Sequence, residues 1–131
     1  TVLSRGLGDV YKRQVSETPS GQNGYVVYSD CKLGEGVTAQ QFYDAYHAYA
    51  VAAKKLGDVA GRKMIFPNIG VPSTWDYDFV QAVSTETIAD YGKNWTNFWN
   101  NADEMPELEA LQELGGTCEN ERSYGIVSVR G

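Results

Sequence analysis

The sequence is poor in the side chains that most metal and nucleic-acid sites require. It holds one histidine, two cysteines, and 11 basic against 17 acidic residues, for a formal net charge of −6. This balance provides no basic stripe to neutralise phosphates, so we expect no nucleic-acid partner. Two cysteines and one distant histidine also fall short of the ligand set of a structural zinc site. We therefore expect no bound metal, and no motif indicates another cofactor.

Long apolar runs are also missing. No stretch approaches the roughly 20 apolar residues needed to span a bilayer, and the N-terminal residues form no hydrophobic signal core. A hydrophobic share of 42% in 131 residues instead suits one compact domain. No catalytic signature accompanies these features, so the composition favours a fold without assigning an activity.

The first fourteen residues differ from the rest of the chain. They show no helical or strand periodicity and hold three of the 11 cations against a single acid, Asp9. Residues 9–14 (DVYKRQ) resemble the in-frame translation of an adapter used in library sequencing of metagenomic DNA, the alternative being a genuine basic tail. We expect residues 1–14 to be an artefact, and any native signal peptide to have been lost with the true N-terminus. The domain without them has 8 positive and 16 negative side chains.

Short β-branched and aromatic runs predict a sheet. Residues 15–24 are rich in Ser, Pro, Gly and Asn and indicate a linker, so we place a single α+β domain at residues 25–131. Within this domain, strands are predicted at residues 25–29, 63–66, 78–83 and 124–129. The first of these is apolar on both faces and is therefore expected in the middle of the sheet.

Apolar stripes at three- and four-residue steps predict three helices. The first stripe consists of Phe42, Tyr46, Tyr49, Ala53 and Leu56, and the second consists of Ile88, Tyr91, Trp95, Phe98 and Trp99. The first follows a capping box that begins at Thr38, and Gly57 ends it. The second is expected to be capped by Ser84 or Thr85. Pro106 opens a short third helix, which a Gly-Gly pair stops.

The predicted order is strand, helix, strand, strand, helix, short helix, strand. Two right-handed strand–helix–strand halves in this order give the ferredoxin-like βαββαβ arrangement, with a short extra helix before the last strand. The helices then cover one face of a four-stranded antiparallel sheet. Because the other face is also expected to carry apolar side chains, we expect a second copy to cover it. The prediction is a homodimer of the dimeric α/β barrel type.

The two cysteines lie at the ends of strands that this arrangement makes neighbours. Cys31 follows the first strand and Cys118 precedes the last, and the two strands run antiparallel. Their sulfurs are therefore expected to meet in a disulfide, the alternative being an unlinked pair. A bridge indicates a periplasmic or secreted protein, because disulfides persist in oxidising compartments.

Aromatic side chains are concentrated on the helix faces expected to meet the sheet. Such a lining suits a flat hydrophobic or aromatic ligand, the alternative being ordinary core filling. We expect a small-molecule-binding module with a pocket between the sheet and the helices. Its candidate ligand-binding residues are Tyr46, Asn68, Gln81, Tyr91, Trp95 and Trp99.

His47 is the single histidine and lies on the flank of the first helix, one turn after Tyr43. As a general base it would make the domain a cofactor-independent monooxygenase or isomerase, with Tyr43 beside it and Asn68, Gln81 or Asn94 orienting a carbonyl. No nucleophile or partnered carboxylate is identifiable beside it. A boundary histidine satisfied by hydrogen bonds is the other interpretation, and it leads us to expect binding rather than catalysis.

From Tyr25 to Arg130 the layout resembles small exported proteins of marine proteobacteria whose function is unknown. The resemblance is carried by Cys31, the Gly-Glu-Gly turn within residues 33–37, the aromatic segment at 95–99, and Cys118 before the last strand. More remotely, the chain resembles the dimeric α/β barrel superfamily, which includes antibiotic-biosynthesis monooxygenases and haem-degrading enzymes. No residue set of those enzymes carries over to this chain, so the resemblance implies fold and export but no activity.

Overall fold

The computed structural model describes residues 23–127 and 129. The adapter-like segment at 1–14 and most of the linker predicted at 15–24 lie outside this part of the chain. The first strand starts slightly before the predicted domain boundary at Tyr25, because Asn23 and Gly24 already pair with the last strand.

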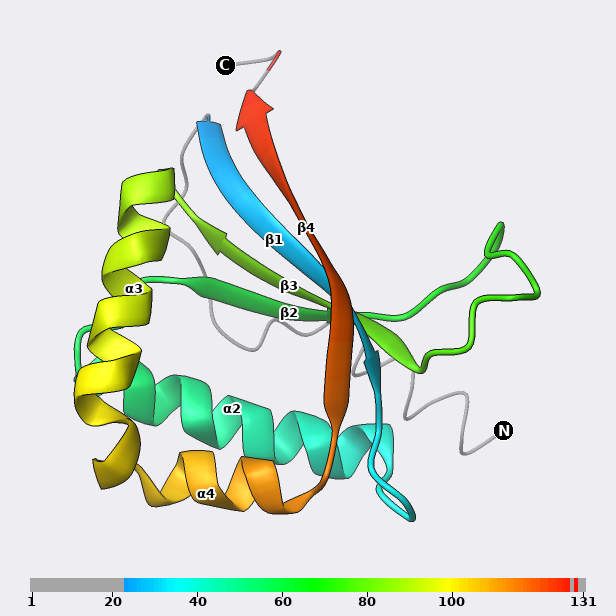
Figure 1. The fold of residues 1–131 in the computed structure, drawn as a ribbon, viewed down its shortest axis with the longest axis horizontal. Helices are drawn as coiled ribbons and strands as arrows, with labels where there is room; N and C mark the ends of the chain where they lie inside the picture. Colours follow the sequence, from blue (N-terminus) through cyan, green and yellow to red (C-terminus); the bar gives the residue numbers. More distant parts are fainter. Residues whose placement is uncertain (1–22, 128, 130–131) are drawn as a thin grey trace.

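A four-stranded antiparallel sheet runs through the described residues (Figure 1). Its strands are β1 (Asn23–Lys32), β2 (Gly61–Ile65), β3 (Phe79–Thr85) and β4 (Thr117–Val127), in the order β2-β3-β1-β4. Every neighbouring pair is antiparallel. The predicted α+β class is confirmed, and the strand order is compatible with a ferredoxin-like arrangement. β1 lies inside the sheet, as its apolar character on both faces indicated.

β4 is longer than the sequence predicted, because it begins at Thr117 rather than at residue 124. It is an edge strand whose residues are exposed except for the half-buried Arg122. An edge strand exposed on both faces needs no alternation of apolar and polar residues, so the pattern does not reveal its first half. A bulge interrupts its pairing with β1 between Tyr28 and Asp30, where Asn120 has a φ of +59°.

Helix α2 (Ala39–Lys55) confirms the predicted first helix. Thr38 Oγ1 accepts a hydrogen bond from Gln41 N at 3.1 Å, and the Gln41 side chain accepts one from Thr38 N at 2.8 Å, which completes the capping box. Gly57 follows the end of the helix with a φ of +102°, a conformation that favours glycine. The buried face of α2 is formed by Phe42, Tyr43, Tyr46, Tyr49, Ala50 and Ala53.

Helix α3 (Ile88–Asn101) starts later than predicted. Thr87 caps it by accepting a hydrogen bond from Asp90 N at 3.1 Å. The cap predicted at Ser84 or Thr85 is wrong, because β3 continues through Thr85, which pairs with Tyr25 of β1. Backbone pairing across the sheet therefore overrode a local capping preference.

Only part of the apolar stripe of α3 faces the sheet, whereas the sequence predicted that all of it would. The buried residue of this helix is Asn94, whose Oδ1 accepts a hydrogen bond from the backbone N–H of Val59 at 3.2 Å. Ile88 and Trp99, which were expected to meet the sheet, are 67% and 70% exposed. The Asn94 amide, anchored to the chain before β2, thus lies on the inner face of α3, and Ile88 and Trp99 lie outside that face.

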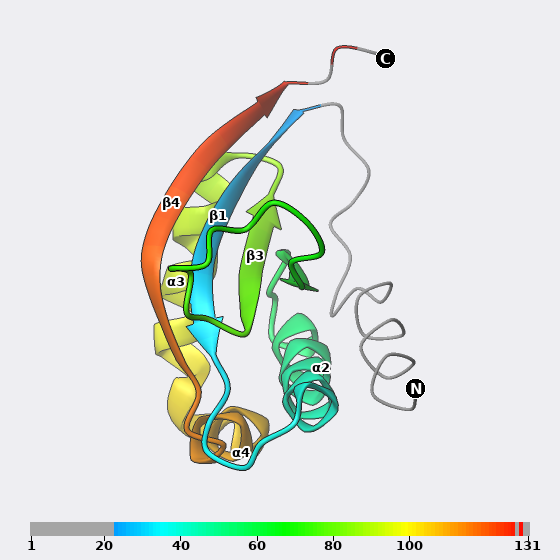
Figure 2. The same cartoon turned by 90° about the vertical axis from the view of Figure 1, so that its right-hand side faces the viewer.

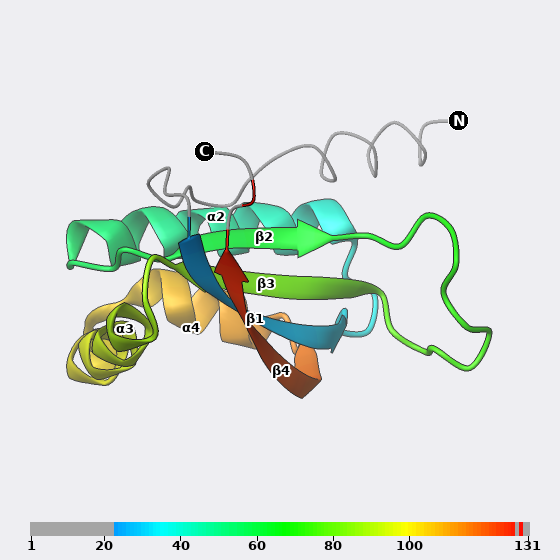
Figure 3. The same ribbon diagram turned by 90° about the horizontal axis from the view of Figure 1, so that it is seen from above.

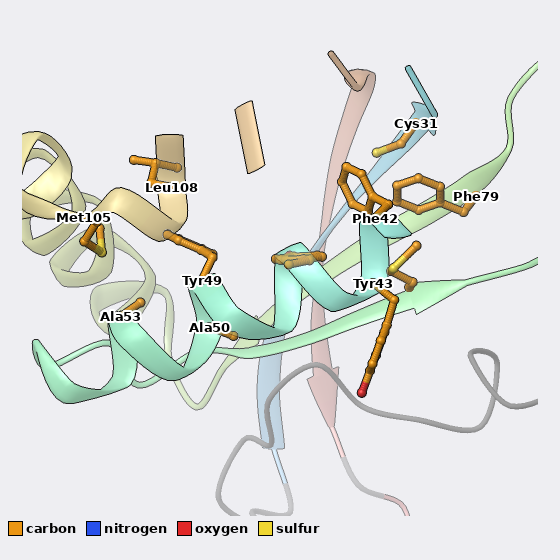
Figure 4. Close-up of a cluster of buried hydrophobic side chains, with 11 residues drawn as sticks. Cys31, Phe42, Tyr43, Tyr49, Ala50, Ala53, Phe79, Met105 and Leu108 are labelled. Atoms are coloured by element: carbon orange, nitrogen blue, oxygen red, sulfur yellow. The ribbon is translucent and has the colours of Figure 1, made fainter. Parts of the chain in front are cut away.

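The short 3-10 helix η1 (Ala102–Glu104) leads from α3 into α4 (Pro106–Glu113), which begins at proline as predicted. α4 lies beside α2 (Figures 1 and 2). In Figure 3 the strands lie over α2 and α4, so these two helices share one side of the sheet. The core between the layers joins α2 to Cys31 and Phe79 of the sheet and to Met105 and Leu108 at α4 (Figure 4).

Candidate ligand-binding pocket

A pocket of about 220 Å³ lies between the sheet and helices α2 and α3. Its floor comes from the helix side of β1 and β3, where Val27 lies opposite Val83 and Ser29 lies opposite Gln81. Alternate residues of a strand point to the same face, so these four side chains form one continuous surface. The sheet register therefore places two apolar and two polar groups side by side under the helices.

Aromatic side chains of α3 form one wall of the pocket. Tyr91, Trp95 and Phe98 line it, with ring centroids 6.4 Å apart for Tyr91 and Trp95 and 5.8 Å apart for Trp95 and Phe98. Both pairs are edge-to-face, an arrangement that aromatic quadrupoles favour. Tyr25 of β1 also meets the Tyr91 ring edge-to-face at 5.5 Å, so the wall is tied to the sheet.

Arg62 of β2 stands at the α2 end of the pocket. Its guanidinium forms an ion pair with Asp58 and lies 5.2 Å from the centroid of the Tyr49 ring, which also lines the pocket. Burial alone would lower the pKa of Arg62, but Tyr46, Asp58 and Tyr49 together raise this pKa above its ordinary value. The guanidinium therefore stays charged, and Asp58 balances that charge.

Two buried donors on pocket-lining residues have no hydrogen-bond partner within the described chain: Arg62 Nε and Asn94 Nδ2. A buried N–H without an acceptor costs stability, of the order of 1–3 kcal/mol. Both atoms are shielded from solvent in this structure, so an acceptor oxygen on a ligand would offset this cost after a small shift of the two side chains. The donors thus favour a ligand that is not a pure hydrocarbon.

Gln81 joins the sheet to α2 at the pocket floor. Its Nε2 donates a hydrogen bond to Tyr46 Oη at 2.7 Å, and its Oε1 lies 3.5 Å from the sulfur of Cys118. Tyr46 itself is almost fully buried. Gln81 is therefore held in one orientation beside the pocket.

The predicted disulfide between Cys31 and Cys118 is confirmed. The two residues are direct partners in the pairing of β1 with β4, with their Cα atoms 4.1 Å apart. Cys31 is fully buried in the core, whereas Cys118 is exposed and lines the pocket. The bridge fixes the edge strand to the central strand next to the pocket.

The structure brings together some of the residues predicted to bind a ligand and separates others. Gln81, Tyr91 and Trp95 line the pocket, and Tyr46 lies behind it in contact with Gln81. Trp99 is outside the pocket on the surface of α3, and Asn68 is exposed in the connection between β2 and β3.

The candidate catalytic pair lies away from the pocket. The rings of Tyr43 and His47 stack at 5.8 Å on α2, and His47 is exposed. Neither residue lines the pocket, although Gln81 and Asn94, considered as carbonyl-orienting groups, both do. Tyr43 is buried and belongs to the core cluster, although its side chain points away from Phe42 and Phe79 in Figure 4.

Sequence reasoning missed Arg62 and Tyr49 as pocket residues. The predicted second strand began at residue 63, so Arg62 fell just outside it and its inward direction was not considered. Tyr49 was recognised only as part of the buried stripe of α2. The sequence signal that could have indicated this buried ion pair is Asp58, an acid four residues before Arg62 at the start of a short strand.

Comparison with known proteins gives no relative: no protein-family model, curated protein or solved structure matches the chain significantly. No helix among residues 23–127 is both long and apolar enough to cross a membrane. The described residues also contain no cluster of three or more His, Cys, Asp or Glu side chains suited to a metal ion.

Proposed function

We propose that this domain binds a small, neutral molecule that contains one aromatic or apolar ring, held between the sheet and α3. The observation that carries this proposal is the pocket itself, with three aromatic side chains of α3 on one wall and valines of β1 and β3 on its floor. Its volume of about 220 Å³ is below the roughly 300–1,000 Å³ of pockets for drug-sized ligands, so we expect a single ring rather than several.

Charge at the pocket supports a neutral ligand. Asp58 balances Arg62, Glu121 adds a carboxylate to the lining, and the chain carries a net charge of −6. An anionic ligand would meet no unpaired cation in the pocket lining described here. Arg62 Nε and Asn94 Nδ2 favour a neutral ligand with an acceptor oxygen on the ring.

Binding of methyl 4-hydroxybenzoate, measured by isothermal titration calorimetry, tests the proposal. A ligand of this size is expected to bind with a Kd between about 10 μM and 1 mM. Methyl 4-methylbenzoate, which replaces the hydroxyl by a methyl group of similar size, is expected to bind several-fold more weakly because its inner end, opposite the ester, has no oxygen to pair with the two buried donors. Equal affinity of the two esters would contradict the acceptor argument.

Two variants locate the binding site. Trp95→Ala is expected to weaken binding of methyl 4-hydroxybenzoate about tenfold or more, because it removes an aromatic wall of the pocket. Trp75→Ala is the matched control, since Trp75 packs against Tyr77 in the β2–β3 connection, away from the pocket. Absence of saturable binding, or the same loss in both variants, would overturn the proposal.

A cofactor-independent monooxygenase or isomerase remains the alternative function, but no observation favours it. It requires His47 to reach a bound substrate, whereas His47 is exposed on α2 and stacks on Tyr43. We therefore place the ligand-binding function first.

We further propose that the domain is a ferredoxin-like fold that forms a homodimer of the dimeric α/β barrel type. Support comes from the strand order and from apolar side chains left partly exposed on β4, including Tyr124, whose ring lies 5.7 Å from that of Tyr28. Light scattering is expected to give twice the 14.4 kDa of one chain, and Tyr124→Lys is expected to give the monomer. Ile88→Lys, on exposed α3, is the control, and a wild-type monomer at micromolar concentration would contradict the dimer.

We also propose that the protein belongs to a periplasmic or secreted location, in keeping with its resemblance to small exported proteins of marine proteobacteria. The Cys31–Cys118 disulfide supports this compartment. Fractionation of the source cells with an antibody against residues 23–127 tests the location. Protein found in the cytosol alone would contradict it.

A further inference from the structure

Trp95 belongs to two surfaces at once. It lines the pocket, yet 45% of its surface is exposed, and its outer side stacks on Trp99 with ring centroids 6.3 Å apart and an interplanar angle of 23°. Trp99 is the more exposed of the two and does not line the pocket. The pair, here called the tryptophan strip, therefore runs from the pocket wall onto the surface of α3.

The strip begins where the pocket opens. The exposed residues of the pocket lining include Trp95 of α3 and Cys118 and Glu121 of β4, so the opening lies between α3 and β4. Trp99 follows Trp95 by four residues, which places it about one helical turn farther along the same side of α3. A molecule that leaves the pocket past Trp95 would meet Trp99 next.

We infer that the natural ligand is longer than the pocket: its ring occupies the pocket, and an apolar tail leaves past Trp95 and lies against Trp99. This inference rests on the proposed binding function. The pocket volume of about 220 Å³ is small for an extended molecule, so the remainder of such a ligand must lie outside. Exposed indole side chains gain free energy when an apolar chain covers them, because both surfaces are then removed from water.

The charges near Trp99 exclude an anionic tail. The last turn of α3 contains no basic residue, and Asp103 and Glu104 follow it in η1. The C-terminal end of a helix also carries partial negative charge. A tail that ends in a carboxylate or phosphate would therefore be repelled, and the exposed indole surfaces of Trp95 and Trp99 favour a hydrocarbon chain over a charged one, so the ligand class is a ring with an alkyl or alkenyl chain.

A series of alkyl 4-hydroxybenzoates with the same ring and increasing chain length tests the inference. In the wild type, affinity is expected to rise from the methyl to the butyl to the hexyl ester, by up to about fourfold for each added methylene. In Trp99→Ala, the methyl ester is expected to keep its affinity within about twofold, and the gain with chain length is expected to disappear. Ile88→Ala is the matched control, because it removes another exposed apolar side chain at the opposite end of α3.

The outcomes separate this inference from the proposed function. If no ester binds, the proposed function is wrong and the inference with it. If the methyl ester binds but longer esters gain nothing in the wild type, or gain equally in Trp99→Ala, the pocket stands and the tail site is wrong. Light scattering on the same variants tests the other possible occupant of the strip, a second copy of the protein. If Trp99→Ala loses the dimer while its affinity still rises with ester length, the strip is assigned to that second copy.

Discussion

Gly34 lies so close to the end of α4 that a β-carbon at this position would be 1.8 Å from the carbonyl oxygen of Leu114. The turn after β1 and the end of α4 are thus in backbone contact, at the place where the chain leaves β1 for α2. Leu114 also packs against the core cluster that contains Phe42 and Leu108. This contact fixes α4 against the layer formed by β1 and α2, and it tolerates no side chain at position 34.

Gly34→Ala is expected to lower the free energy of unfolding by about 2 kcal/mol or more, because backbone must shift to admit the methyl group. Urea denaturation measures the change. Gly92→Ala is the control on α3, where nothing lies within 4 Å of the added β-carbon. This second variant is expected to raise stability by up to about 1 kcal/mol, as alanine favours a helix over glycine. A neutral Gly34→Ala would contradict the close packing.

Tyr46→Phe is expected to cost about 1–2 kcal/mol, because it leaves the Gln81 side-chain amide without the acceptor it now has at 2.7 Å. Thermal unfolding of the oxidised protein measures this loss. Tyr124→Phe removes the hydroxyl of a half-exposed tyrosine on β4 and is expected to change stability by less than about 0.5 kcal/mol. Similar effects of the two substitutions would show that the Tyr46–Gln81 bond contributes little.

Reduction of the Cys31–Cys118 disulfide is expected to lower stability by about 2–4 kcal/mol, since the bridge closes a separation of 87 residues in the unfolded chain. Cys31→Ala combined with Cys118→Ala is expected to have a similar effect. Because Cys118 lines the pocket, bound methyl 4-hydroxybenzoate is also expected to slow reduction by a dithiol. Two thiols that react with a maleimide in the denatured, unreduced protein would contradict the bridge.

Local signals predicted α2 well because they are complete within the segment itself. Thr38 and Gln41 form the capping box, and Gly57 provides the positive φ that ends the helix, so no distant residue is needed to define it. The disulfide was also predictable, since it follows from the neighbouring positions of β1 and β4. These features depend on residue type and on strand order alone.

Features that depend on tertiary contacts were not predictable in the same way. The first half of β4 is polar and exposed, so its strand state follows from pairing with β1. The aromatic stripe of α3 indicated a buried face, but the hydrogen bond between Asn94 and Val59 sets the rotation of the helix and leaves Trp99 exposed. The pocket residue Arg62 was missed because its partner Asp58 and the ring of Tyr49 define its place only after folding.

His47→Gln is expected to leave the affinity for methyl 4-hydroxybenzoate unchanged and to lower stability by at most about 1 kcal/mol, because His47 is exposed and contacts the Tyr43 ring rather than the pocket. Calorimetric titration and thermal unfolding measure the two quantities. If some substrate is turned over by the wild type but not by His47→Gln at an unchanged melting temperature, the enzyme alternative replaces the binding function.

Tyr49 makes the stability of the protein depend on pH in the alkaline range. Burial raises the pKa of its phenol above the ordinary value of 10.0, and the nearby Arg62 only partly opposes this shift. The folded state therefore holds the phenolic proton more tightly than the unfolded state does. This contribution to stability is fully present below pH 10.0 and is lost as the pH rises from there through the higher pKa of the folded state.

Tyr49→Phe is expected to remove that dependence, because phenylalanine has no proton to lose. Above pH 10.0, the melting temperature of the wild type is therefore expected to fall more steeply than that of Tyr49→Phe, while other titrating groups contribute equally to both proteins. An absorbance titration of the phenolates is expected to show one late-titrating tyrosine fewer in the variant. Parallel melting curves across this range, together with unchanged phenolate titration, would mean that Tyr49 is not protected from water, and the wall that it forms beside Arg62 would be open.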